Sequence, residues 1–361
     1  MSTGVFSIAV PVGAYHDLLA SCLESLRRQT APVQVCLLDA SGDARVKQLA
    51  DSFASLFHYR RHGPDAGQSA AIAEGWAHSD GDILGWLNAD DFLYPDALRD
   101  AAGAFASDPG LDVVYGHSAI CDEKFRMTGY HWAVSPPGEE LQRGCNISQP
   151  SCFFRRQACE AVGGLDPNLH YTMDWDLWLR LAAARARFSL IEKPLSAVFW
   201  GAGTKTSNFA ERRRGELHRL IERYGPAGSK LKTLRGFAVQ AALDNLRPVA
   251  LRTWVRDHVF SNKQRVFGVA PDGRLDTHAQ INWFHLDQKP KSSLLLTMTN
   301  GDAIAIRPSR PAREVFRSRG LIEVEFGAPV AAGEVVALDL SHDGRNTVRF
   351  RSCEWGGREA T

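Results

Sequence analysis

Two adjacent acids end an apolar run in the segment GDILGWLNADDFLYPDAL, which covers residues 81–98. Carboxylates at the end of a buried strand are costly unless they are paired, hydrogen-bonded or bound to a cation. Acids can also cap a helix, but a helix that Pro95 starts would take its cap from one of the two residues before it. We therefore expect Asp90 and Asp91 to hold Mn²⁺ or Mg²⁺, with phosphate oxygens as the other ligands.

Acids also follow two other apolar runs. Asp39 follows a run that ends at residue 38, and Asp65 lies in the loop after a third run. Helical periodicity separates the runs, which predicts a parallel sheet with helices on both faces. Ligands of such sheets bind outside the carboxyl ends of the strands, so we expect these acids to share one site. The predicted strands are 6–12, 33–38, 56–60 and 82–87, and the predicted helices between them are 18–26, 43–55 and 67–78.

The middle of the chain continues this pattern and then becomes helical. The apolar runs predict further strands at 111–120 and 151–156, and a buried helix at 174–187. Residues 209–258 have largely helical periodicity, which breaks at Gly225-Pro226 and at Pro248.

The sequence pattern changes at Arg265. Short alternating runs separated by Gly, Pro, Asp and Asn predict an antiparallel β-sandwich of about eight strands. Trp283 alternates with Ile281 in one run, which favours a core position over a sugar-stacking one. The predicted domains are an α/β domain at 1–225, a basic helical linker at 226–260 and a β-sandwich at 261–361.

Composition indicates the class of protein. The 361 residues are 44% hydrophobic and 23% charged, which predicts a globular chain of two or three domains. The seven cysteines include no C-x-x-C pair, so we expect no zinc site, no disulfide framework and a cytoplasmic location. We also expect no signal peptide and no membrane span, because no apolar run approaches about eighteen residues.

Residues 205–265 are strongly basic, with fourteen Lys and Arg residues against five Asp and Glu residues. Mixed cationic and apolar residues are typical of helices at a membrane surface. Peripheral binding at the inner face of the membrane is therefore one interpretation, and a solvated helical face is the other. No nucleic-acid partner is expected, because interleaved aromatic residues and nucleic-acid motifs are absent from the sequence.

The sequence has neither a G-x-G-x-x-G after a strand nor a P-loop, so phosphates must be held in another way. It does contain five ordered blocks: AVPVGAYHDLLASCLESLRRQT, LLDASGD, DAGQSAAIAEGWAHSDGDILGWLNADD, SQPSCFFRR and VGGLDPNLHYTMDWDLWLRLA. Together these blocks resemble the family 2 glycosyltransferases of the GT-A fold. The resemblance covers residues 5–225 and implies a Rossmann-like, mixed and mainly parallel sheet with flanking helices.

The resemblance implies a donor site for a nucleotide sugar. Asp39 matches the acid that binds the nucleobase, and Asp90 matches the best metal ligand, with Asp91 beside it. Asn88 stands where the family's D-x-D motif has its first acid. The other matched residues are Pro11, Val12 and Gly13 in the base pocket, Asp65, Gln68 and Ser69 in the loop that closes over the donor, and Ala89 within the motif.

The resemblance also implies an acceptor side. Asp174 matches the general base, and Gln149, His170 and Trp175 are assigned to the acceptor. Three alternatives remain open: Asp174 caps a helix that starts at Trp175, Asp176 is the base instead, or His170 is structural. The family often carries a metal-binding histidine where this chain has Gly201, so metal affinity could be weak, water could replace the side chain, or the metal requirement could be lost.

These residues predict an inverting glycosyltransferase. It would move a sugar from a nucleoside-diphosphate sugar, UDP-linked as the first candidate, to a hydroxyl of a glycan or lipid-linked acceptor. Surface polysaccharide biosynthesis, such as that of lipopolysaccharide in the cell envelope, is the expected context. The alternatives are a non-catalytic glycan-binding or scaffold protein with a degenerate metal site, and a nucleotidyl transferase that releases diphosphate.

Overall fold

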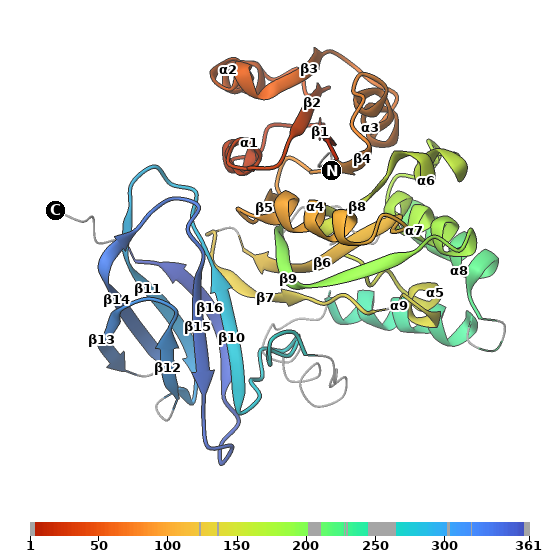
Figure 1. Ribbon diagram of the computed structural model, residues 1–361. Helices are drawn as coiled ribbons and strands as arrows, with labels where there is room; N and C mark the ends of the chain where they lie inside the picture. The colour runs from red at the N-terminus through yellow and green to blue at the C-terminus, as the bar shows by residue number, and fades with distance from the viewer. Residues whose placement is uncertain are drawn as a thin grey trace. The chain divides into compact units, whose positions relative to one another are not determined.

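The computed structural model forms two compact units (Figure 1). Unit 1 comprises the described parts of 1–117, 133–196 and 202–245, and unit 2 comprises those of 118–132, 197–201 and 246–361. The structure describes residues 4–122, 124–135, 137–200, 211–226, 228, 230–244, 265–301, 304–318 and 320–356.

The sheet of unit 1 confirms the predicted mixed, mainly parallel architecture. Its strands follow the order β3-β2-β1-β4-β8-β6, of which the first four are parallel and the last two join antiparallel. Every residue of β1 is buried, as expected of a strand covered on both faces. The strands are β1 Phe6–Val12, β2 Val33–Asp39, β3 Phe57–His62, β4 Ile83–Trp86, β6 Val113–Cys121 and β8 Cys152–Arg155.

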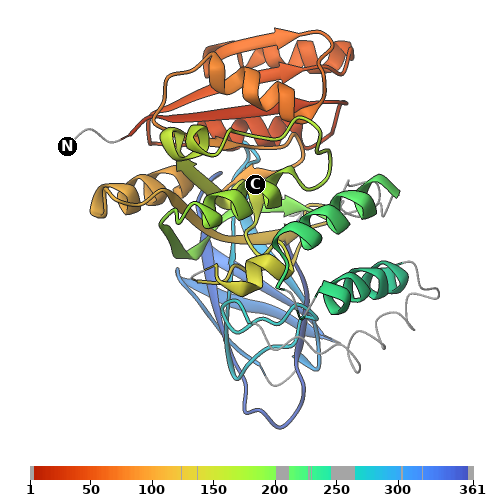
Figure 2. The ribbon, with the colours of Figure 1, turned by 90° about the vertical axis from the view of Figure 1, so that its right-hand side faces the viewer.

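Helices cover both faces of these strands (Figures 1 and 2). The helix α3 packs so closely on the sheet that a Cβ on Gly75 would lie 2.9 Å from Leu38 Cδ2, so the third strand-helix unit needs glycine there. The helices are α1 Leu19–Arg27, α2 Ala44–Ser52, α3 Gln68–Ala77, α4 Ala97–Ser107, α5 Glu139–Arg143, α6 Arg156–Ala161, α7 Met173–Ala183, α8 Glu211–Tyr224 and α9 Lys230–Asp244, with short 3₁₀ helices η1 Ala54–Leu56 and η2 Gln149–Ser151.

Two helix boundaries differ from the prediction. The helix expected to start at Pro95 is α4, which begins at Ala97 with Asp96 at its N-cap position. The helix expected to end at residue 187 is α7, which ends at Ala183 because Arg185 adopts a left-handed φ of 62° and Ala186 N–H donates to Leu181 O. The sequence analysis did not identify the long strand that follows, β9 Phe188–Phe199, or the short β5 Phe92–Leu93.

Unit 2 consists of antiparallel strands, as predicted for the C-terminal region. One sheet has the order β13-β14-β11-β16-β7 and the other has β10-β15-β12. Trp283 is 2% exposed, which confirms its core position. The strands are β7 Met127–His131, β10 His278–Trp283, β11 Lys291–Thr299, β12 Ala305–Pro308, β13 Ala312–Ser318, β14 Leu321–Val330, β15 Val336–Ser341 and β16 Arg349–Trp355.

The basic stretch is described only in part. Its described helices are α8 and α9, whereas residues 201–210 and 245–264, which include Gly201 and Pro248, lie outside the described residues. Within the described part of the chain, no helix combines the length and the apolar character that crossing a membrane would require.

Candidate functional site

The side chain of Asn88, just after β4, joins several predicted site residues. Its Oδ1 accepts a hydrogen bond of 2.8 Å from Gln68 Nε2, and its Nδ2 donates to Asp91 Oδ2 at 3.1 Å and to Gln149 Oε1 at 3.2 Å. Gln149 Nε2 donates in turn to Trp86 O at 2.7 Å. An aspartate at position 88 could not donate to these two acceptors, so the asparagine fits the network as it stands.

The two adjacent acids lie beside a buried thiol. Asp91 is 6% exposed and Asp90 is half-buried. Burial raises the pKa of the Cys22 thiol well above its ordinary value, and the charges of Asp91 and Asp90 raise it further. Cys22 Sγ also lies 3.5 Å from Asn88 O, so α1 packs directly behind the acids. Cys22 lies in the predicted helix 18–26, and the sequence analysis gave it no role at this site.

The donor atoms of this pair suit a hard divalent cation. Carboxylate oxygens are preferred by Mg²⁺ and Mn²⁺, which commonly take one or two carboxylates together with substrate phosphates and water. No cluster of three or more His, Cys, Asp or Glu side chains able to hold a metal occurs among the described residues. Asp90 and Asp91 therefore fit a cation that arrives with a phosphorylated ligand better than a cation held by protein atoms alone.

Asp39 ends β2 next to the end of β1. It is 3% exposed, and its Oδ1 accepts from Ser41 N at 2.9 Å and from Ser41 Oγ at 2.5 Å. Its Oδ2 lies 2.8 Å from His62 Nδ1, a partner that the sequence analysis missed. The register of the sheet pairs Asp39 with His62, so a strand-pairing prediction would have been needed to find it.

The residues beside Asp39 leave open space at the carboxyl ends of β1 and β2. Val12 is the register partner of Asp39, and Pro11 and Val12 are buried. Gly13 is exposed, and a Cβ added to it would meet nothing within 4 Å. The structure thus brings the predicted base-pocket residues together around a strand end with room beside it.

The side chain of Asp65 stabilises the turn of the loop between β3 and α3. Asp65 Oδ1 accepts from Gly67 N at 2.8 Å, and Gly67 has a φ of 115° that favours glycine. Arg61 approaches Asp65 at 3.4 Å while its Nε donates to Glu74 at 2.8 Å. The loop is therefore held in a defined turn at the predicted donor side.

Ser69 faces α7 and not the open edge of the sheet. Its buried hydroxyl lies 3.2 Å from Leu169 O and 2.9 Å from Met173 Sδ. These contacts join the start of α3, on the predicted donor side, to the start of α7, on the predicted acceptor side.

Asp174 lies in the first turn of α7. Its Oδ1 accepts from Trp175 N at 2.7 Å, but α7 starts at Met173 with Thr172 at the N-cap position, so the alternative in which Asp174 caps a helix starting at Trp175 is wrong. Burial raises the pKa of Asp174 to about 6, against the lowering effects of backbone amides and of Arg213. Its charge also raises the pKa of the thiols of Cys145 and Cys152, which places it near the segment on either side of Gln149.

The competing acid has another role. Asp176 is buried and accepts from Arg180 Nε at 2.8 Å within an ion pair, and Arg180 also donates to Val162 O at 2.6 Å. Asp176 is thus neutralised by the next turn of its own helix, whereas Asp174 has no ion pair among the described contacts. This contrast favours Asp174 as the proton acceptor.

The aromatic residues assigned to the acceptor side differ in exposure. Trp175 is buried and its Nε1 donates to Leu141 O at 2.6 Å. His170 is half-buried, and its ring lies 4.9 Å from that of Tyr171. The backbone of the loop that carries His170 is bound by Glu216 of α8, which the sequence analysis did not identify.

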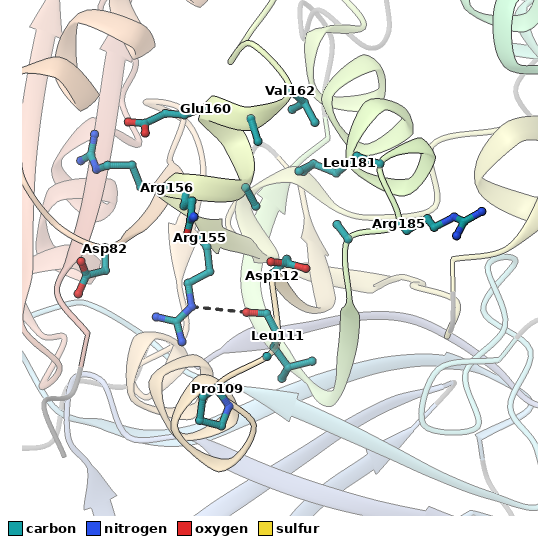
Figure 3. A pocket seen from close by; sticks show the side chains of 16 residues that line it. Asp82, Pro109, Leu111, Asp112, Arg155, Arg156, Glu160, Val162, Leu181 and Arg185 are labelled. Carbon is teal, nitrogen blue, oxygen red and sulfur yellow. Dashed lines mark hydrogen bonds between the residues drawn. The ribbon is translucent and has the colours of Figure 1, made fainter.

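A cavity in unit 1 lies at the amino ends of the strands, opposite the predicted site (Figure 3). Its volume is about 720 Å³ and its lining contains none of the predicted site residues. Asp82 and Asp112 border it, each just before a strand begins. Figure 3 shows Arg155 beside Leu111, whose carbonyl accepts from Arg155 Nε at 3.5 Å.

Comparison with known proteins gives a family and several relatives. The model of the family "Glycosyl transferase family 2" matches residues 7–162. A PGL/p-HBAD biosynthesis glycosyltransferase of Mycobacterium bovis is 28% identical over 185 residues, which is 50% of this chain and 70% of that protein. The O-antigen biosynthesis protein RfbC of Myxococcus xanthus is 28% identical over 214 residues, which is 57% of this chain and 16% of RfbC.

Among solved structures, S. aureus TarS 1–349 in complex with UDP-GlcNAc aligns at 15% identity and a TM-score of 0.48, over 72% of this chain and 76% of that one. The matched family segment, 7–162, includes β1 from residue 7 on, the Asn88 network and Gln149, and it ends before α7. This segment of the chain therefore matches the glycosyl transferase family 2 model.

Proposed function

We propose that this glycosyltransferase moves a sugar, with inversion, from a nucleoside-diphosphate sugar to a hydroxyl of a glycan or lipid-linked acceptor. The observation that carries the proposal is Asp174, a half-buried carboxylate in the first turn of α7 that lies in the same unit as the strand-end acids and whose pKa is raised to about 6 by burial. The names of the relatives, in PGL/p-HBAD and O-antigen biosynthesis, support a surface polysaccharide or glycolipid context.

Asp174 would take the proton from the acceptor hydroxyl. With a pKa of about 6 it is mostly ionised at pH 7, yet more basic than an ordinary aspartate. As the proton moves to Asp174, the acceptor oxygen bonds to the anomeric carbon and the bond from that carbon to the diphosphate breaks. A nucleoside diphosphate leaves, the proton passes to solvent, and attack opposite the leaving group inverts the anomeric centre.

Asp90 and Asp91 would hold the diphosphate end of the donor through Mn²⁺ or Mg²⁺. A bound cation would supply charge neutralisation for the leaving phosphates. The protein's own part is to keep Asp91 in one orientation, and the 3.1 Å hydrogen bond from Asn88 does so. Gly201, at the position of the family histidine, lies outside the described residues, so the proposal assigns it no role.

Asp39 would accept a hydrogen bond from an N–H group of the nucleobase. Each of its oxygens has two lone pairs, so the contacts with Ser41 and His62 leave it able to accept another donor. Gly13 keeps the space beside the strand end open. Uridine is the first base to test.

The test combines binding with turnover. UDP and GDP should each be titrated with and without Mn²⁺, and a panel of UDP- and GDP-sugars should be assayed for release of the nucleoside diphosphate. Metal-dependent binding and release of nucleoside diphosphate are expected. Release of inorganic diphosphate would indicate nucleotidyl transfer instead, and failure to bind any nucleotide would overturn the proposal.

Peripheral membrane binding belongs to the same proposal. On α8 the side chains of Arg214, Arg219 and Arg223 are exposed. Such cations gain about 1 kcal/mol each near an anionic surface. Sedimentation with vesicles of anionic lipid, compared with neutral vesicles, should retain the chain only in the anionic case and at low salt. Equal retention by both would contradict this.

Glycan binding by unit 2 is a second candidate. A cavity of about 600 Å³ lies beside β10 and β15, bordered by Phe267, Gln280 and Asp339, which combine an aromatic ring with planar polar groups. Binding of glycans to the full chain, unchanged by Asp174→Asn and lost in Gln280→Ala, would support it. A chain that binds glycans there but turns over no donor would favour the non-catalytic alternative.

A further inference from the structure

Glu216 is a charged side chain buried in unit 1. It is 0% exposed and lies on the buried face of α8 with Leu217, Leu220 and Ile221. A carboxylate in such a position is costly unless hydrogen bonds compensate its lost hydration. Its partners therefore indicate what it holds in place.

Those partners are consecutive backbone amides directly before α7. Glu216 Oε1 accepts from His170 N at 3.0 Å, and Oε2 accepts from Tyr171 N at 2.8 Å and from Thr172 N at 3.2 Å. The hydroxyl of Thr172 lies 3.3 Å from the same Oε2. One carboxylate thus ties three successive residues to α8.

This contact fixes the start of α7. Amides at a helix start lack partners within the helix, and a negative charge there is favourable. Thr172, the N-cap residue, makes no capping bond with its own side chain, and Glu216 binds both its backbone N–H and its hydroxyl. Asp174 follows two residues later and bonds only to the backbone of its own turn among the described residues.

Only one cation contacts Glu216 in the described ion pairs. Arg212 Nε lies 3.4 Å from Glu216 Oε1, and its side chain is 59% exposed. This separation is long for an ion pair and the arginine is largely solvated, so the amides are the stronger partners. Arg212 therefore offers a matched control one turn away on the same helix.

We propose that Glu216 is a positioning residue of the transfer reaction: it fixes residues 170–172 and the first turn of α7, and through them the place of Asp174. This inference depends on the proposed role of Asp174 as the base. Glu216 itself does not touch the substrate. Because misplacement of a reacting group by about 1 Å can cost about a hundredfold in rate, the tie is of catalytic and not only structural value.

The experiment compares Glu216→Gln with Arg212→Ala in the full chain. Glutamine has the size of glutamate, but its NH₂ group is only a donor. It therefore cannot accept the hydrogen bonds that the backbone N–H groups donate to one of the carboxylate oxygens. Glu216→Gln should lower kcat for release of nucleoside diphosphate from a UDP-sugar by about tenfold to a hundredfold. The donor KM and the Kd of UDP with Mn²⁺ should change less than about threefold. Arg212→Ala should remain within about twofold of the parent protein in every parameter.

A double-mutant cycle separates positioning from general damage. If Glu216 acts through Asp174, then Glu216→Gln should lower the residual rate of Asp174→Asn little or not at all. Equal effects of Glu216→Gln in both backgrounds, or a kcat within about twofold of the parent, would overturn the proposal.

Hydrogen exchange tests the tie without any turnover. The amides of residues 170–172 should exchange faster in Glu216→Gln while the strands of the unit 1 sheet keep their protection. Unchanged exchange at these amides overturns the inference even if the chain is active. If instead the parent protein releases no nucleoside diphosphate while the amides respond as expected, the proposed function fails and the structural tie stands. Should Glu216→Gln fold poorly, Thr172→Val removes only the hydroxyl contact and should give a smaller change of the same kind.

Discussion

The charged residues at the carboxyl ends of the unit 1 strands have different partners from those at the amino ends. At the carboxyl edge, Asp39 and Asp91 are nearly buried and hydrogen-bonded to neighbouring polar side chains. At the opposite edge lies the cavity of about 720 Å³, where Arg156 donates to Gly81 O and Trp76 O at 2.9 Å each. The cavity thus contains an arginine that binds backbone carbonyls, whereas the acids Asp39 and Asp91 lie at the carboxyl ends of the strands.

This difference shows that cavity size alone does not identify the site. Open α/β sheets bind ligands outside the carboxyl ends of their strands, which is where Asp39 and Asp91 lie. In the same unit, burial raises the pKa of Asp174 to about 6. Activity should therefore depend on the carboxyl edge and be insensitive to the cavity.

The largest effect is expected from Asp174→Asn. Removal of a general base should lower turnover by about 10²- to 10⁴-fold while the Kd of UDP with Mn²⁺ stays unchanged. The amide oxygen can still accept from Trp175 N, so the first turn of α7 should persist. Steady-state kinetics and titration of UDP measure both quantities. Normal sugar transfer by this variant would show that the base lies elsewhere.

A smaller effect is expected from Asp90→Ala. Loss of one carboxylate of the proposed cation pair should weaken binding of UDP about tenfold in the presence of Mn²⁺ and leave metal-free binding unchanged. Isothermal titration with and without Mn²⁺ gives the comparison. Equal weakening in both conditions would mean that Asp90 acts on the nucleotide without a cation.

The pH dependence should report Asp174 directly. The base must be deprotonated, so kcat should fall about tenfold for each pH unit below a pH near 6, the raised pKa of Asp174. Asp174→Asn should remove this acid limb. Rates of the parent protein measured from pH 5 to 8 test the expectation, and a flat profile in the parent would contradict it.

The smallest effect is expected at the cavity. Arg185 borders it and has a left-handed φ of 62°, which glycine adopts without strain. Arg185→Gly should leave kcat and KM within about twofold of the parent and raise the free energy of unfolding by about 0.5–1 kcal/mol. Denaturant unfolding measures the stability. A large loss of activity in Arg185→Gly would show that the reaction depends on the cavity, which would contradict the expectation.

Most of unit 1's sheet could be predicted from sequence because its strands are short apolar runs. The missed strand β9 has a largely half-buried pattern and contains Pro194, so neither an apolar run nor a clean alternation marks it. His62 pairs with Asp39 through strand register, which composition does not reveal. Glu216 binds backbone amides 44 to 46 residues away, and backbone amides have no sequence signature.

Unit 2 is built from separate stretches of the chain. In β7, Met127 pairs with Cys353 of β16, and the hydroxyl of Tyr130 accepts from Asn282 N at 2.8 Å. A fragment cut near residue 260 would separate these partners. Transfer of the C-terminal strands to another protein would therefore have to carry residues 118–132 as well, and protein engineers who want a minimal transferase face the same constraint.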